Sequence, residues 1–216
     1  TGGAAMRYLE AVADVLTQIP SAPDFVITAA MNRATRKFCE LSGAYRLRVQ
    51  NITVKSGLQT YDLDFYLPGG TTIHKVDSVI LSNKRLKPAT FKFVSQELGT
   101  KIADQDTPQY FVQPTPTQLE LWQIPKDNAS KALEAQLILK PLRDADEIED
   151  WFGEKYYEAL IAGTVSEMSR TPNTEFYNPS LFPLMEQYFN SAIMEAKKEA
   201  TGADRAVPRK VRYGGY

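Results

Sequence analysis

The sequence predicts an α+β fold in which helices occupy both ends of the chain and β-strands the middle. Apolar residues recur every three or four positions near each end, but every second position between residues 45 and 141. Clusters of Pro, Gly and Asn divide the middle into short stretches, as expected for antiparallel strands. A helix pair cannot bury its apolar stripe alone. We therefore expect two N-terminal and two C-terminal helices to form a four-helix bundle with an inserted antiparallel β layer and an extended C-terminal tail.

The N-terminal segment is predicted to form two helices. The first apolar stripe runs from Leu9 to Ile19 and is followed by a proline that stops the pattern. The second helix is expected to begin at Pro23, because proline suits a first helical position. Gly43 stands where a helix C-cap belongs.

The middle region is predicted to form a meander of about six strands. Alternating apolar residues, such as Tyr61, Leu63 and Phe65, are typical of strands with one buried face. One short helical turn is expected at residues 95–98.

Helical spacing returns after Pro141. A stripe from Ile148 to Gly163 predicts a third helix, and a last helix is expected to carry Pro183 in its first turn and to end near Gly202.

These patterns divide the chain into three parts. They predict a helical bundle over residues 1–44 and 142–202, an inserted β domain over residues 45–141, and a tail over residues 203–216. The 25 Lys and Arg residues nearly balance the 26 Asp and Glu residues, giving a formal net charge of −1. This balance argues against a protein that coats nucleic acid along its whole surface.

The chain shows no evident catalytic constellation. His74 is the only histidine, and we interpret it as a surface residue on an exposed strand edge rather than as a general base. Cys39 is the only cysteine, which excludes an intrachain disulfide and a multi-cysteine zinc site; we expect it to be buried. No phosphate-binding or dinucleotide-binding glycine motif is present. We predict no enzymatic activity, no cofactor and no metal.

Charge is segregated along the chain. Residues 144–158 contain seven carboxylates and only Lys155 as a cation, whereas residues 203–216 contain four cations and one carboxylate. We expect the carboxylates to occupy the first turns of the third helix, where they line a solvated face or meet a basic partner. Complementary patches on one molecule favour head-to-tail association into a ring. The candidate residues for contacts between subunits are Asp144, Asp146, Glu147, Asp150, Arg33, Arg36 and Lys37.

The C-terminal tail combines cations with valines and tyrosines, which are side chains that anchor peptides in grooves. A terminus that is disordered in the isolated protein is compatible with this interpretation, because a segment can become ordered when it binds. The candidate binding residues are Arg205, Val207, Arg209, Lys210, Val211, Arg212, Tyr213 and Tyr216.

Several segments occur in an order that characterises a known family. They are the alanine-rich basic stretch at 29–34, the Tyr-x-Leu strand at 61–63, the stretches at 107–110, 119–125 and 137–141, the aromatic-led helix from Trp151, and the basic tail. In these features the chain resembles the head-to-tail adaptor (connector) proteins of tailed bacteriophages, especially the tail tubular protein A-like adaptors of short-tailed phages. It departs from them in its Gly-Gly-Tyr ending and in a long insertion around residues 82–106.

The resemblance implies a structural protein that forms a ring, dodecameric in this family, below the portal protein. Such a ring lines a channel for double-stranded DNA without reading its sequence and offers its far side to the tail nozzle protein. The tail becomes the portal-binding element, with Arg209, Lys210 and Arg212 as charge contacts and Val211, Tyr213 and Tyr216 as apolar anchors. The implied location is the head-tail junction of a virion, after synthesis in the host cytoplasm.

Two alternatives remain open from the residues. The acidic run at 144–154 could serve a metal-dependent hydrolase or nuclease, with Asp146 and Asp150 one helical turn apart as ligands. The other alternative is a general protein-interaction module built on the helices. No apolar run approaches the roughly 18 residues needed to span a bilayer, so we expect no membrane partner.

Overall fold

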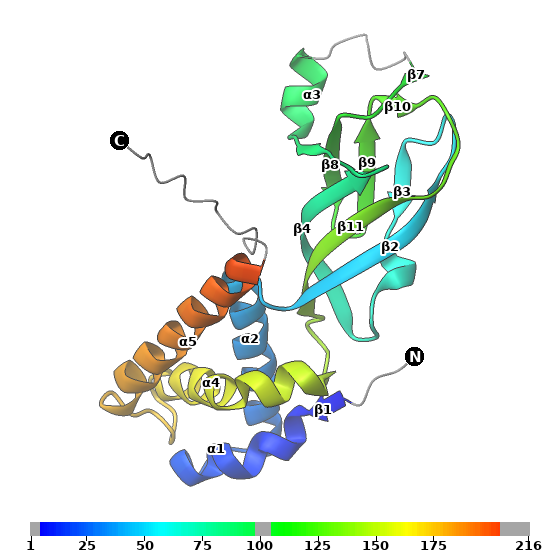
Figure 1. Ribbon diagram of the computed structural model, residues 1–216. Coiled ribbons are helices and arrows are strands. Elements are labelled where there is room, and N and C mark those ends of the chain that lie inside the picture. Colours follow the sequence, from blue (N-terminus) through cyan, green and yellow to red (C-terminus); the bar gives the residue numbers. More distant parts are fainter. Residues whose placement is uncertain (1–4, 98–104, 204–216) are drawn as a thin grey trace, which may run out of the picture.

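The computed structural model describes residues 5–97 and 105–203. The fold is a mixed α+β fold, as predicted, with α1, α2, α4 and α5 gathered at one end of the molecule and the two larger sheets and α3 at the other (Figure 1). The helices are α1 (Val12–Gln18), α2 (Asp24–Ser42), α3 (Phe91–Glu97), α4 (Asp150–Ser169) and α5 (Leu181–Ala203), with 3₁₀ turns at Tyr8–Ala11 and Asp64–Tyr66. The strands are β1 (Ala5–Arg7), β2 (Arg46–Val54), β3 (Thr60–Asp62), β4 (Thr71–Leu81), β5 (Lys84–Arg85), β6 (Lys87–Pro88), β7 (Gln105–Asp106), β8 (Tyr110–Thr115), β9 (Gln118–Trp122), β10 (Ile124–Pro125), β11 (Ala129–Pro141) and β12 (Glu147–Glu149).

Helix α2 follows the sequence prediction closely. It begins directly after Pro23 and ends before Gly43, whose φ of 62° is the left-handed conformation that glycine adopts without strain. The Gly43 N–H donates to the carbonyl of Cys39 at 3.0 Å, which caps the helix. Its buried stripe includes Ile27, Met31 and Phe38. The first helix, by contrast, is a 3₁₀ turn followed by only seven α-helical residues.

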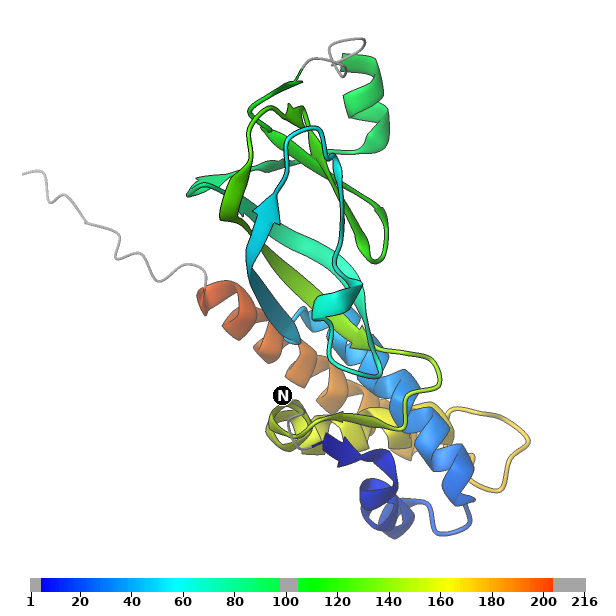
Figure 2. The same cartoon turned by 90° about the vertical axis from the view of Figure 1, so that its right-hand side faces the viewer.

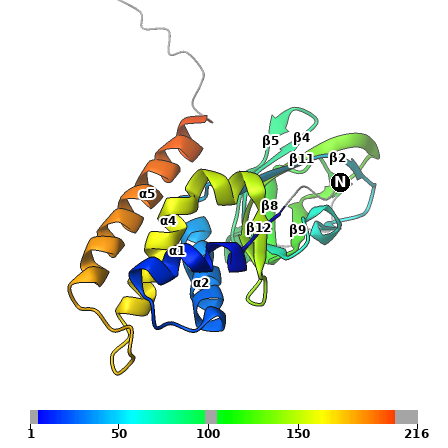
Figure 3. The same ribbon diagram turned by 90° about the horizontal axis from the view of Figure 1, so that it is seen from below.

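The four helices of this end pack on one another, but they do not confirm the predicted four-helix bundle. Helix α4 crosses α2 instead of running alongside it (Figures 1 and 3). Helix α5 packs along α4, where Gly163 admits the ring of Phe189. Pro183 lies in the first turn of α5, as predicted, because a residue there donates no intrahelical hydrogen bond.

The strands form two four-stranded sheets and two short two-stranded pairs, which corrects the predicted meander. The first sheet has the order β2-β11-β4-β5, so β11 lies between two strands that precede it in the sequence. The second has the order β3-β9-β8-β6. The pairs β6/β8 and β7/β10 are parallel, so the β layer is not wholly antiparallel. The view in Figure 2 shows α3 at the end of the molecule farthest from the helical part.

A short antiparallel pair of strands, β1 with β12, was not predicted. Met6 lies opposite Ile148 in this pair, and both side chains are buried. The strand occupies residues that we expected to begin the third helix, and α4 starts only at Asp150. The expectation that Asp144, Asp146 and Glu147 lie on the first helical turns is therefore wrong.

One continuous hydrophobic core joins the helices to the sheets. The end of α2 packs against β11, and the Ile138 side chain lies beside Gly43. At the same junction the Lys140 ammonium pairs with the Glu40 carboxylate at 2.6 Å. The position of the helices relative to the strands therefore depends on both apolar packing and an ion pair.

Candidate interaction surfaces

The acidic loop, residues 142–146, is held against helix α2 by a buried amide. The Asn32 side chain donates to the carbonyl oxygens of Leu142 at 3.0 Å and Ala145 at 2.6 Å. The Tyr8 N–H donates to the Asp146 carbonyl at 2.9 Å. Because these bonds hold the backbone inward, the side chains of Asp144 and Asp146 are exposed to solvent. Glu147, the first residue of β12, is exposed beside them.

The three predicted basic contacts lie on α2. Arg33 forms an ion pair with Glu167 of α4, and the Lys37 ammonium lies 5.6 Å from the centre of the Phe189 ring on α5. Arg36 is half-buried. In the part of the chain that the structure describes, no ion pair joins these cations to the acidic loop. The acidic loop nevertheless lies beside α2, because Asn32, which holds the loop, is one helical turn before Arg36.

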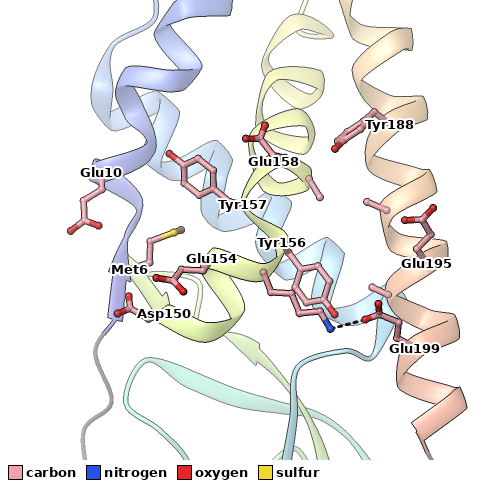
Figure 4. A pocket seen from close by; sticks show the side chains of 14 residues that line it. Met6, Glu10, Asp150, Glu154, Tyr156, Tyr157, Glu158, Tyr188, Glu195 and Glu199 are labelled. Atoms are coloured by element: carbon pink, nitrogen blue, oxygen red, sulfur yellow. Dashed lines mark hydrogen bonds and ion pairs between the residues drawn. The ribbon is translucent and has the colours of Figure 1, made fainter.

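An acidic groove of about 950 Å³ lies over the start of α4, between the N-terminal segment and α5 (Figure 4). Its carboxylates come from all three segments, which are far apart in the sequence. They are Glu10, Asp150, Glu154, Glu158, Glu195 and Glu199. Only Asp150 of this set was a predicted contact residue. The carboxylates of α5 share the groove because residues 195 and 199 recur on one helix face that turns toward α4.

Two polar contacts order the groove. The Lys155 ammonium pairs with Glu199 at 2.6 Å, and this hydrogen bond raises the lysine pKa against the opposing effect of burial. The Tyr157 hydroxyl donates to the Asp14 carboxylate at 2.5 Å. Burial, followed by this hydrogen bond, raises the Tyr157 pKa to about 12. Both contacts tie α4 to a neighbouring helix along the groove.

The residues considered for catalysis, His74, Cys39, Asp146 and Asp150, are not brought together in the fold. His74 is exposed on β4, as predicted, and burial of its ring followed by the nearby Lys140 charge lowers its pKa. Cys39 is fully buried, as predicted, and burial raises its thiol pKa. Asp146 lies in the loop and Asp150 begins α4, so they do not share a helix face as the hydrolase alternative requires. Residues 5–97 and 105–203 contain no group of three or more His, Cys, Asp or Glu side chains arranged to hold a metal ion.

Exposed aromatic side chains are a feature that the sequence patterns missed. Phe65 was predicted to continue a strand, but it lies in the 3₁₀ turn after β3 and is 88% exposed. It borders a pocket of about 670 Å³ that Glu147 and Glu149 also line. Phe25 and Tyr188 are also more than half exposed, on α2 and α5. Alternation alone cannot locate such residues, because a turn changes which way the next side chain points.

The predicted tail contacts, from Arg205 to Tyr216, lie outside the described residues. Across the described ranges no helix combines the length and apolar character needed to cross a membrane.

The fold and these surfaces define a mixed α+β protein that exposes an acidic groove and several aromatic side chains. Comparison with known families makes the assignment specific. Residues 6–212 match the family described as SU10 adaptor protein, and the chain belongs to that family. The resemblance to phage head-to-tail adaptors, drawn from the sequence, is confirmed. No curated protein matches the chain. Membership in an adaptor family indicates a structural protein of the phage virion at the head-tail junction.

Proposed function

We propose that this protein forms a ring, dodecameric as in related adaptors, that joins the portal protein to the tail nozzle protein and surrounds the DNA channel. The observation that supports this proposal is the family match over residues 6–212, which covers both the helical and the β parts. The role is structural, acting during genome retention and ejection, and no step in it requires catalysis.

The tail, residues 203–216, is the proposed portal-binding element. Its four cations, Arg205, Arg209, Lys210 and Arg212, supply charge contacts, and its valines and tyrosines supply apolar anchors. The segment follows α5, a 23-residue helix whose last turn lies where the helical part adjoins the sheets (Figure 1). The end of the β part that carries α3, farthest from the helices (Figure 2), is the proposed side that meets the nozzle.

The contacts between subunits are proposed to pair different surfaces of adjacent copies. The acidic loop is exposed and has no ion-pair partner among the described residues, and α2 presents the cations Arg36 and Lys37. A contact between two unlike surfaces repeats around a closed ring, which is the symmetry that a channel requires.

The charge of the helical part supports a role beside DNA. Residues 1–44 and 142–203 contain 16 Asp and Glu residues but only 9 Lys and Arg residues. A wall with excess negative charge repels phosphates and releases no counterions, so DNA passes it without adhering.

The first test is whether the protein is present in purified virions, measured by mass spectrometry of intact particles. The proposal expects it as a stoichiometric component, and absence from particles would overturn the proposal.

The second test measures docking of the full chain onto portal rings. We expect the triple variant Arg209→Gln, Lys210→Gln, Arg212→Gln to lose docking. The matched control Lys197→Gln, Lys198→Gln, which neutralises exposed cations on α5, should retain it. Equal docking by both variants would refute the role of the tail.

A further inference from the structure

The acidic groove carries negative charge that the rest of the described protein does not neutralise. Among residues 5–97 and 105–203, Lys155 is the only cation lining it, and Lys155 is already paired with Glu199 at 2.6 Å. The other five carboxylates have no ion-pair partner among those residues; they are Glu10, Asp150, Glu154, Glu158 and Glu195. Bringing like charges together in one groove is unfavourable unless a cationic group joins them.

The shape of the groove suits an extended peptide. On the α5 side, small side chains at Ala192 and Ala196 leave room between Tyr188 and Glu199. From Tyr188 to Glu199 the helix advances by 11 residues, which is about 16 Å at 1.5 Å per residue. Tyr188 is 54% exposed and offers an aromatic face on which a guanidinium or a second ring can stack.

The chain contains a segment with complementary charge next to this groove. Residues 204–216 contain four Lys and Arg residues against one Asp, and they follow Ala203, the last residue of α5. Glu199 lies one helical turn before that end and belongs to the groove. Thirteen residues can extend at most about 45 Å, which is enough to reverse direction and run back along α5.

We propose that the acidic groove binds the basic tail, residues 204–216, of the same chain. The tail arginines pair with the unpartnered carboxylates of α4 and α5, and its tyrosines pack near Tyr188. Arginine suits this role because its guanidinium forms two parallel hydrogen bonds with a carboxylate. This inference concerns the free protein and holds whether or not the tail also binds a portal.

The same chain is favoured over a second copy because the tail is covalently attached to one wall of the groove. A binding segment joined to its site by a few residues has an effective concentration in the millimolar range, far above the protein concentration of most solutions.

The proposal is tested by disulfide formation in the full chain. Gly214→Cys is combined with Ala192→Cys, which lies in the groove, or with Ser191→Cys, the preceding residue, which does not line the groove. Native Cys39 is fully buried and does not compete. Under mild oxidation we expect the 192/214 pair to form an intrachain disulfide at least about tenfold faster than the 191/214 pair. Equal rates would overturn the proposal.

The charge dependence is tested in the same 192/214 background. Glu154→Gln, Glu158→Gln and Glu195→Gln together should reduce the rate to that of the 191/214 pair. The control Asp64→Asn, Asp127→Asn and Glu175→Gln removes three exposed carboxylates outside the groove and should leave the rate unchanged. If the groove variant forms the disulfide as fast as the 192/214 background, charge does not hold the tail, and the proposal is contradicted.

The mass of the product identifies the occupant. A disulfide within one 24.2 kDa chain supports the proposal, whereas a product of twice that mass assigns the groove to the tail of a second copy and overturns the same-chain assignment.

Discussion

At Gly163, helices α4 and α5 approach so closely that a methyl group would collide with the ring of Phe189. A Cβ at this position would lie 2.6 Å from the nearest ring carbon, well inside van der Waals contact. We expect Gly163→Ala to lower the free energy of unfolding by about 1–2 kcal/mol, because overpacking outweighs the better helix propensity of alanine. Urea unfolding measures the change.

Gly202, at the end of α5, is the matched control. A Cβ there meets no atom within 4 Å, so Gly202→Ala should leave the free energy of unfolding unchanged or raise it by up to about 1 kcal/mol. Equal destabilisation at both positions would show that steric contact with Phe189 is not the cause.

At the scale of an element, the acidic loop depends on the two hydrogen bonds donated by Asn32. Asn32→Asp keeps the shape but turns a carboxylate oxygen toward two carbonyl oxygens. We expect a loss of about 2–3 kcal/mol in the free energy of unfolding, because two bonds become repulsive contacts in a buried site. The Tyr8 amide, which donates to Asp146, should exchange its hydrogen faster.

The exposed Asn190 on α5 provides the control, and Asn190→Asp should change neither stability nor Tyr8 exchange. If the Tyr8 amide stays equally protected in Asn32→Asp, the loop does not depend on Asn32.

At the scale of the whole molecule, the ion pair of Glu40 and Lys140 links α2 to β11. Burial opposes ionisation of Glu40, but the hydrogen bond from Lys140 and the charges around the carboxylate, that of Lys140 first, together outweigh it and lower the Glu40 pKa. A carboxyl whose folded pKa is lowered stabilises the protein above its unfolded pKa, and this contribution is lost as pH falls through the folded value. Glu40→Gln should therefore cost up to about 1 kcal/mol at pH 7, since the pair is partly exposed.

The difference between Glu40→Gln and the natural chain should shrink as pH falls below about 4.5. Denaturant unfolding from pH 7 to pH 3 measures it, with Glu175→Gln, an exposed carboxylate, as the control. A difference that is the same at every pH would contradict the assignment to ionised Glu40.

The continuous core predicts that the helical and β parts unfold together. The chain has two tryptophans, Trp122 on β9 and Trp151 on α4, so each part has its own fluorescent reporter. The variant Trp122→Phe leaves Trp151 as the only fluorescent tryptophan, and Trp151→Phe leaves Trp122. In each variant we expect the fluorescence of the remaining tryptophan to change at the same urea concentration as the circular dichroism. Separate midpoints within a variant would show two independently unfolding units.

Much of the fold could be predicted because helix and strand periodicities are local. Helix α2, its Gly43 cap and the position of Pro183 each depend on neighbours within one or two turns. The incorrect predictions have a common cause, because each concerns a segment whose structure departs from its local sequence pattern. Phe65 continues an alternating pattern but enters a 3₁₀ turn, and the residues before Asp150 join Met6 in a strand pair that no local pattern encodes.

The features of the candidate surfaces also fall into those that local sequence predicts and those that it does not. The sequence by itself determined the family, the order of helices and strands, and the segregation of charge, because each is a property of residues near one another along the chain. Only the tertiary structure decided that β11 lies between β2 and β4, and that Glu10, Glu154 and Glu195 line one groove. These outcomes depend on contacts between segments that lie far apart along the chain, and such contacts are selected by packing of the whole core.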